Sequence, residues 1–257
     1  MINTILCWYS SLYKVFAIFL FIVSTHVFGQ DFEKIFNPDF QIAIDIINDI
    51  KPKMETQIKN LEGDYKVCAA IVFPEIIRYS LLKDKIETAA LKVFYTKLGN
   101  GYANFSIGLF QMKPSFVERL EKEIISFLEL NEFHFISEYP SNISKENERN
   151  LRLKRLSDLD WQITYLVCFI RLIDNIHNNN YSELGVQNIK NRISLIATSY
   201  NTGFWYDIDK ISEYKTINLF PTGNNIANNQ FNYHDISYYF YENYLNNIDF
   251  IPPSPAK

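Results

Sequence analysis

The chain has 257 residues and a net charge of −4, and 47% of its residues are hydrophobic. This apolar content excludes a disordered polyelectrolyte, and the acidic balance argues against a general nucleic-acid-binding protein. Only 8 glycines and 9 prolines interrupt the sequence, and apolar residues recur at helical spacing over long stretches. The composition therefore predicts a mainly α-helical protein with one sizeable globular domain.

The first 29 residues have the pattern of an export signal. A short apolar core at residues 15–23 follows a lysine, and a cleavage site is expected between Gly29 and Gln30. This core is shorter than the roughly 20 apolar residues that a membrane-spanning helix needs. We expect residues 1–29 to be a signal peptide that directs the chain to the periplasm. Retention as a membrane anchor is the alternative, because residues 5–13 are also apolar.

Residues 30–63 are expected to form an N-terminal helical extension. Apolar residues repeat at helical spacing over residues 40–50, and Pro52 is expected to end or kink that helix because proline has no backbone N–H. A second, more apolar helix is predicted over residues 65–80, with a kink at Pro74.

The rest of the chain alternates apolar helical segments with glycine- and asparagine-rich breaks. A break is predicted at residues 99–101, followed by a loop over 102–112. Residues 131–145 are expected to be a polar connection, and residues 207–230 an irregular segment. The predicted helices cover residues 85–98, 114–130, 146–176 (as one helix or two), 186–200 and 233–245. A flexible proline-rich tail is expected over residues 249–257.

The cysteines and histidines give no sign of a metal site. Cys68 and Cys168 form an even pair in a chain expected to be exported, so a disulfide is open. Both lie inside apolar helical stretches, which favours buried free thiols. The histidines lack metal-ligand spacing to cysteines or acids, so we predict no metal and no cofactor; they stand at positions 26, 134, 177 and 234.

Glu75 is the first candidate for a catalytic group. It follows the apolar run over residues 67–74, which is expected to be buried on nearly every side. Removal from water raises the pKa of a carboxyl group, and a carboxyl that stays protonated near neutral pH can donate a proton. The alternative is an ordinary helix-surface glutamate that pairs with Arg78 one turn later.

A polar loop supplies the second candidate group, with Ser106, Gly108 and Gln111 shortly before Pro114. Glycine lets a ligand approach the backbone closely, and glutamine offers both a donor and an acceptor. This combination suits a polar polymer such as a glycan.

The third candidate group, Tyr-Asn-Thr-Gly at residues 200–203, ends a predicted helix. A tyrosine hydroxyl there can hydrogen-bond a carboxyl group, and asparagine can hold a sugar amide. The alternative is a plain helix stop, with asparagine and glycine as left-handed caps.

Taken in this order, the segments resemble the lytic transglycosylase family, the lysozyme-like helical enzymes that cleave bacterial peptidoglycan. The motifs are Phe-Pro-Glu at residues 73–75, Ser-Ile-Gly-Leu-Phe-Gln-Met-Lys-Pro at 106–114, and Ala-Thr-Ser-Tyr-Asn-Thr-Gly at 197–203. The tyrosine-rich helix at residues 233–245 also resembles the last core helix of the family. The resemblance implies a lysozyme-like helical domain with a cleft over residues 64–248.

The resemblance also implies a reaction and a substrate. Glu75 would be the single general acid and base, acting on peptidoglycan glycan strands without a cofactor. It would protonate the oxygen that links N-acetylmuramic acid to N-acetylglucosamine. It would then take a proton from the muramyl C6 hydroxyl, so that a 1,6-anhydro ring closes without water.

The remaining motif residues would bind the substrate. Ser106 and Gln111 would contact sugar or position the acid, and Gly108 would permit close approach of the glycan. Tyr200 would orient the acid, and Asn201 would support the same subsite.

The chain departs from the family pattern near the proposed acid. The spacing from Glu75 to Ser106 is long, so residues 83–101 would be an insertion or an extended helix. Ile76 stands where relatives usually carry serine. Glu87 is a rival acid nearer to the loop, but its polar neighbours make a raised pKa less expected.

Other functions stay open at this stage. A hydrolytic muramidase that inverts the anomeric centre needs a second carboxylate roughly 6.5–9.5 Å from the acid, and Asp84, Glu87 and Asp160 are conceivable. A non-catalytic glycan-binding protein, acting as a scaffold in a cell-envelope or secretion machine, would keep the cleft without the chemistry.

Overall fold

The computed structural model describes residues 30–81, 88–177, 189–221 and 230–246. The chain up to Ile35 and the chain from Phe36 onward form separate compact units, and the second contains the candidate residues. The described residues are mainly helical, as predicted, and contain isolated β-bridges but no longer strand. None of the described helices is both long enough and apolar enough to cross a membrane. The expected signal segment and the expected tail lie outside the described residues.

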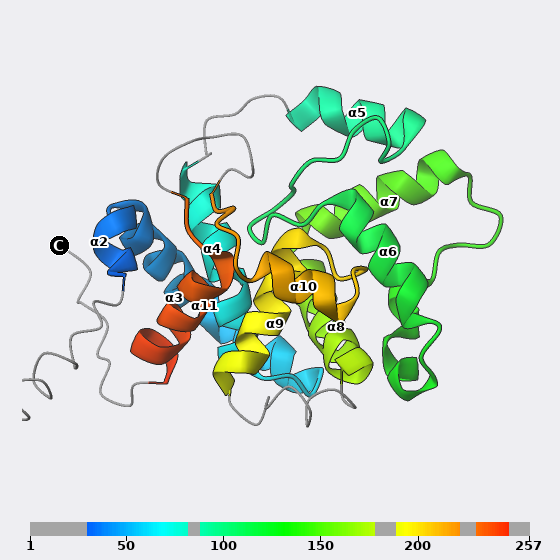
Figure 1. The fold of residues 1–257 in the computed structure, drawn as a ribbon. Coiled ribbons are helices and arrows are strands. Elements are labelled where there is room, and N and C mark those ends of the chain that lie inside the picture. The colour runs from blue at the N-terminus through cyan, green and yellow to red at the C-terminus, as the bar shows by residue number, and fades with distance from the viewer. Residues whose placement is uncertain (1–29, 82–87, 178–188, 222–229, 247–257) are drawn as a thin grey trace, which may run out of the picture. The chain divides into compact units, whose positions relative to one another are not determined.

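The helices are shown in chain order in Figure 1. They are α2 (Phe32–Phe36), α3 (Asp39–Asn60), α4 (Tyr65–Leu81), α5 (Thr88–Leu98), α6 (Pro114–Ile124), α7 (Lys145–Ser157), α8 (Leu159–His177), α9 (Ile189–Thr202), α10 (Ile208–Tyr214) and α11 (Tyr233–Phe240). A 3₁₀-helical segment, η1 (Leu128–Ser137), follows α6, and a π-helical turn, η2 (Tyr241–Leu245), continues α11.

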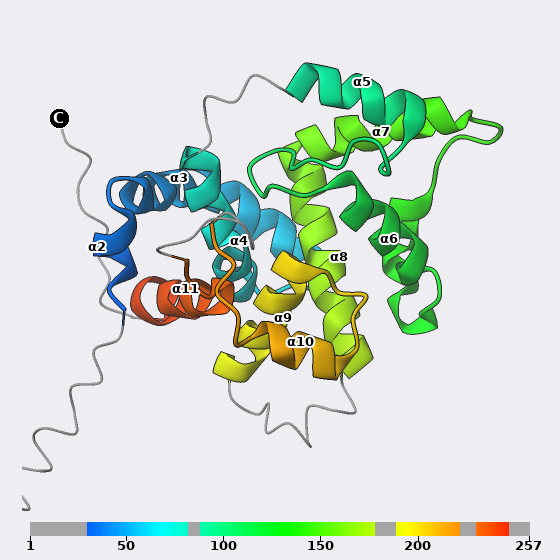
Figure 2. The ribbon, with the colours of Figure 1, turned by 45° about the horizontal axis from the view of Figure 1, so that its top comes forward.

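Helix α4 is enclosed by other helices. Its residues 67–77 are buried on every face, and α3, α8, α9, α11 and η2 pack against it. The views in Figures 1 and 2 place α4 among these helices. Phe73 stacks on Phe240 with ring centroids 3.7 Å apart and meets Phe40 edge to face at 5.0 Å. An apolar helix of this kind can bury all of its faces only at the centre of a helical domain.

Helix α3 belongs to the same compact unit and packs along α4 and α8. The part of the expected extension that starts at Phe36 is therefore integrated with the helices that follow it. Of the two effects expected of Pro52, an end of the helix is excluded, because α3 runs on to Asn60; a kink stays a prediction. Met54 and Ile58 follow the proline and are fully buried, so their packing offsets the lost backbone hydrogen bond.

A second group of helices packs around α8, where α6, α7 and η1 meet it. The segment predicted over residues 146–176 forms two helices, because Asp158 between them has an extended backbone. Figure 2 shows α5 alongside α7 at the edge of this group. Helix α10 was not predicted, and Asp207 caps it by accepting a hydrogen bond from the Lys210 amide at 2.8 Å. Cys68 and Cys168 are buried free thiols, as the sequence favoured.

Candidate active site

A hollow of about 180 Å³ brings together segments that lie far apart in the sequence. Its lining comes from the C-terminal part of α4, the loop before α6, and the end of α9 with the residues that follow it. The expected site residues Glu75, Ser106, Gln111, Tyr200 and Asn201 all line it. The candidate motifs therefore meet at one place.

Glu75 lies at the base of this hollow and is only 3% exposed. Its Oε1 and Oε2 both accept hydrogen bonds from Nη1 of Arg78, at 3.0 and 2.9 Å. The pair with Arg78, which the sequence allowed as the alternative to a catalytic role, is thus present, but the carboxyl group is buried and not at the helix surface. A single guanidinium nitrogen serves both oxygens, so this is not the two-nitrogen fork of the strongest arginine–carboxylate pairs.

Burial raises the pKa of Glu75 above its ordinary value, because the ionised form loses hydration. The charges of Arg78 and Lys113 oppose this effect, as do the hydrogen bond from Arg78 and the nearby Tyr233 hydroxyl. The single proton of the Tyr233 hydroxyl is donated to the Ile71 carbonyl oxygen at 2.9 Å. Burial thus favours the protonated form of Glu75, while Arg78 is the ion-pair partner of its charged form.

The loop before α6 is held by helices on either side. The backbone N–H of Phe110 donates to Oε1 of Gln162 on α8 at 2.8 Å, and the Phe110 carbonyl accepts from the Tyr200 hydroxyl at 2.8 Å. An antiparallel bridge between Ile107 and Met112 closes the loop at its base. These contacts fix the segment that carries Ser106 and Gln111.

Gly108 has a different reason for being glycine than the one expected. Its φ is +72°, and an added Cβ would lie 1.9 Å from Nε2 of Gln162 and 2.8 Å from the Leu156 carbonyl oxygen. The glycine therefore lets the loop approach α8 inside the protein. It is not among the residues that line the hollow, and the expected close approach of a glycan to Gly108 stays a prediction.

The hydrogen bond of Tyr200 is made to the loop, and the expectation that Tyr200 orients Glu75 stays a prediction. Its hydroxyl proton is given to the Phe110 carbonyl, so Tyr200 anchors the loop while its ring lines the hollow. Gln111 has a φ of +51°, and its Nε2 donates to the Gly108 carbonyl at 2.7 Å. This bond makes the Gln111 side chain part of the turn. The amide oxygen of Gln111 then remains as the acceptor that a ligand can use.

Several residues at the hollow were not proposed from the sequence as substrate contacts. Arg78 was considered only as a surface partner of Glu75, although its i+3 spacing on α4 places it on the same helix face. Lys113 lies within the loop motif itself, and Trp205 follows the Tyr-Asn-Thr-Gly motif by two residues. Tyr233 carried no local signal, because α11 reaches Glu75 only through the tertiary fold.

Trp205 forms part of the hollow with 43% of its surface exposed. Its ring lies over Gly203, where an added Cβ would approach Cζ2 to 2.5 Å. Gly203 has a φ of +116°, a conformation that side chains other than glycine rarely adopt. Glycine is thus needed at position 203 for two reasons. It allows the positive φ of the turn, and it leaves room for the indole ring of Trp205.

Of the other candidate acids, only Asp160 lies among the described residues. Asp84 and Glu87 lie outside the described residues. Asp160 is not part of the lining, and it forms an ion pair with Lys53 at 2.9 Å. Among the described lining residues, Glu75 is therefore the acidic one.

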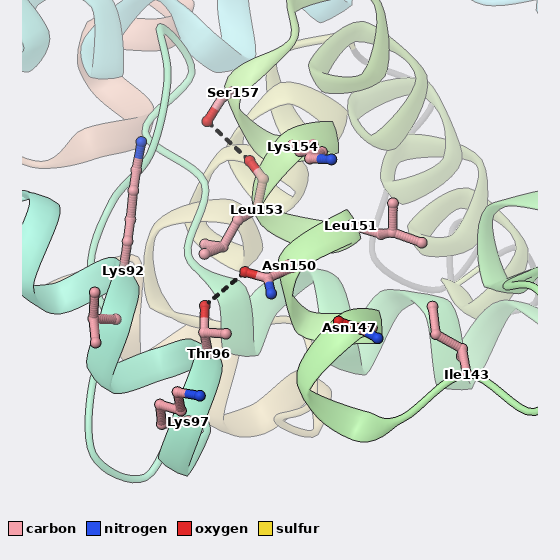
Figure 3. A pocket seen from close by; sticks show the side chains of 11 residues that line it. Lys92, Thr96, Lys97, Ile143, Asn147, Asn150, Leu151, Leu153, Lys154 and Ser157 are labelled. Carbon is pink, nitrogen blue, oxygen red and sulfur yellow. Dashed lines mark hydrogen bonds between the residues drawn. The ribbon is translucent and has the colours of Figure 1, made fainter.

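A larger hollow of about 770 Å³ lies between α5 and α7 (Figure 3). Thr96 donates to Asn150 across it at 3.1 Å, and Lys97 pairs with Glu146 at 2.6 Å. Its described lining contains no Asp, Glu, His or Cys side chain. Of the two hollows, the smaller one at Glu75 is therefore the one that has a carboxyl group among its described lining residues.

Within the described part of the chain, no three His, Cys, Asp or Glu residues are grouped as metal ligands. No protein-family model, curated protein or solved structure matches the chain. The site must therefore be interpreted from its own chemistry.

Proposed function

We propose that the protein is a peptidoglycan lytic transglycosylase in which Glu75 acts as the single general acid and base. The observation that carries the proposal is the convergence of the candidate motifs on one hollow with a buried carboxyl group at its base. Polar side chains of Ser106, Gln111 and Asn201 surround this carboxyl, and Trp205 offers an exposed aromatic face of the kind on which sugar rings stack.

The proposed reaction needs one carboxyl group that changes its role. Protonated Glu75 gives its proton to the glycosidic oxygen as the bond from that oxygen to C1 of N-acetylmuramic acid breaks. The muramyl C6 hydroxyl oxygen then bonds to C1, and its proton passes to Glu75. The carboxyl group is restored, and the products are a shortened strand and a 1,6-anhydromuramyl end. A pKa raised by burial favours the protonated form that starts the cycle.

Asp160, the described candidate for a second carboxylate, pairs with Lys53 and does not line the hollow, so it gives no support to hydrolysis with inversion. An inverting muramidase would need a base at roughly 6.5–9.5 Å to activate water on the far side of the sugar.

The second candidate is a glycan-binding protein without catalysis, for example a scaffold in a cell-envelope machine. The contact of both Glu75 oxygens with Arg78 favours it, because an ion-paired carboxylate is a poor proton donor.

Cleavage of purified peptidoglycan by the purified full chain separates these functions. We expect 1,6-anhydromuropeptides as products, identified by mass spectrometry, and a loss of about 10²–10⁴-fold in rate for Glu75→Gln. The matched control is Glu123→Gln, which removes a half-buried glutamate that is paired with Arg119 at 2.7 Å outside the hollow and should cleave normally.

Each of the other possible results of this assay points to a different function. Products with reducing ends would indicate a muramidase. Strand binding without cleavage across pH 4 to 9 would select the glycan-binding protein, and an unchanged rate in Glu75→Gln would remove Glu75 from the mechanism.

A further inference from the structure

Arg78 uses only part of its hydrogen-bonding capacity. A guanidinium group has five N–H donors in a planar fork. Nη1 of Arg78 serves Glu75, whereas Nε is buried without a hydrogen-bond partner among the described residues. The group lies 5.0 Å from the centre of the Phe220 ring, which supports its flat face. Arg78 also lines the hollow, so a turn of its guanidinium group would bring unused donors to a ligand.

The local charge of the hollow is opposite in sign to the charge of the whole chain. Arg78 and Lys113 both line it, and Glu75 is the acidic residue of its described lining. The Lys113 side chain forms no ion pair with a described acid, and its residue is exposed. The chain as a whole carries −4, so this balance is a local feature. A hollow with excess positive charge favours an anionic ligand.

We infer that the hollow takes a saccharide that carries a carboxylate, and that this carboxylate replaces Glu75 as the partner of Arg78. The inference rests on the proposed function and makes it more specific. A carboxylate fits the two-nitrogen fork of arginine better than the single-nitrogen contact that Glu75 makes. Lys113 supplies a second positive contact, and the exposed ring of Trp205 supplies a surface for the sugar.

The exchange would prepare Glu75 for catalysis. The groups that face its carboxyl are Arg78 from α4, Lys113 before α6, Tyr200 from α9 and Tyr233 from α11. When the Arg78 guanidinium turns to a ligand carboxylate, the ligand neutralises the main positive charge that stabilises ionised Glu75. The Glu75 carboxyl group itself stays buried. Glu75 then takes up a proton from solvent. A neutral saccharide leaves the Glu75–Arg78 pair intact and is cleaved more slowly, and this includes a muramyl residue whose lactyl group is joined to a peptide by an amide bond. Arg78 therefore acts as a positioning residue that favours muramyl residues without a peptide, whose lactyl carboxylate is free.

The binding test uses the full chain and glycan strands from which the peptides have been removed. One sample keeps the free lactyl carboxylates, and the other has them converted to methylamides with carbodiimide and methylamine. We expect the neutral strands to bind about tenfold more weakly or worse, since hydrogen bonds to charged groups are the strong ones. Arg78→Gln should remove this preference, and Arg78→Lys should keep part of it because its charge remains.

The matched control is Arg119→Gln, which removes an exposed arginine from another helical ion pair and should keep the full preference. Equal binding of both strand samples by the unaltered protein, or a preference that survives in Arg78→Gln, overturns the inference.

The kinetic test follows the pH at which cleavage is lost. The pH at which kcat/KM falls reports the pKa of the acid in the free protein, and the pH at which kcat falls reports its pKa in the complex with the strand. With carboxylated strands, the kcat limb should lie at higher pH than the kcat/KM limb, because Arg78 has left Glu75. With neutralised strands, or in Arg78→Gln, the two limbs should coincide.

Failure of this inference can be told from failure of the proposed function. Cleavage of both strand samples with one pH profile overturns the inference and leaves the proposed function standing. A carboxylate preference through Arg78 without any cleavage supports the inference and overturns the proposed function.

Discussion

Glu75 and Glu121 are both buried carboxyl groups, at 3% and 5% exposure, and each contacts an arginine. They differ in how completely their oxygens are bonded. Oε1 of Glu121 accepts from the hydroxyls of Tyr139 at 2.6 Å and Tyr165 at 2.9 Å. Its Oε2 accepts from Nε and Nη2 of Arg152, at 2.9 and 2.6 Å.

The Glu121 carboxyl therefore sits in a closed network that joins α6, α7 and α8, and it lines neither hollow. Glu75 has a single guanidinium nitrogen as its ion-pair partner and faces open space. Burial alone does not distinguish a structural acid from a reactive one. The distinguishing features are incomplete bonding and an opening through which a ligand can arrive.

The largest effect on stability is expected at Glu121. Glu121→Gln removes the buried carboxylate of this network and leaves Arg152 with only the more exposed Glu118 and Glu148, so it should lower the free energy of unfolding by about 3 kcal/mol. Glu75→Gln should cost much less, because Arg78 lies at the hollow, where water can reach it. Urea unfolding of both variants measures the contrast, and equal losses would contradict the distinction between the two carboxyl groups.

A smaller loss, about 2 to 3 kcal/mol, is expected for Gly108→Ala. The new methyl group would meet Gln162 in a backbone conformation that alanine disfavours. The loop should move, so cleavage should fall together with stability. Gly101→Ala is the matched control, because an added Cβ there meets nothing within 4 Å. Thermal unfolding and peptidoglycan cleavage test the pair, and normal behaviour of Gly108→Ala would show that the loop tolerates the clash.

Tyr200→Phe should cost about 1 kcal/mol, because the Phe110 carbonyl loses its donor. The pH profile of cleavage should stay unchanged, since the hydroxyl does not bond Glu75. Tyr102→Phe alters a tyrosine that is 73% exposed and serves as the control. A shifted pH profile in Tyr200→Phe would restore the original expectation that this hydroxyl orients the acid.

The smallest effect concerns pH and stability. The pKa of Glu75 is raised in the folded protein, so the native state keeps a proton that the unfolded state releases above about pH 4.3. The stability of the protein relative to Glu75→Gln should therefore fall as pH rises from that value towards the native pKa. Urea unfolding of both proteins between pH 4 and 8 measures this difference. A difference that grows with pH would mean that the ionised pair with Arg78 is net stabilising.

The sequence was sufficient where short-range patterns decide the structure. Apolar spacing predicted most of the helices, and the unbroken apolar run before Glu75 predicted its burial. Pro52 does not end its helix, because the packing of residues beyond it outweighs the local cost of proline. Helix α10 was missed because it is short and its cap lies in a polar, asparagine-rich segment.

The partners of the site residues could not be found from local patterns. Gln162 meets the loop from a helix more than 50 residues away, so nothing near Gly108 announces it. The same holds for Tyr233 beside Glu75. The order of the motifs indicated that they would meet, whereas the roles of Gly108 and Tyr200 depended on which helices lie behind the loop.

Because the Trp205 indole lies over Gly203 at the hollow, its intrinsic fluorescence can report the binding of a ligand. The chain has only 3 tryptophans, and Trp161 is covered by the Arg155 guanidinium at 4.1 Å from its ring. The Trp205 indole is partly hydrated at the edge of the hollow. A sugar ring that covers it would exclude water and move its fluorescence emission to shorter wavelength, so occupancy of the hollow can be titrated without a label.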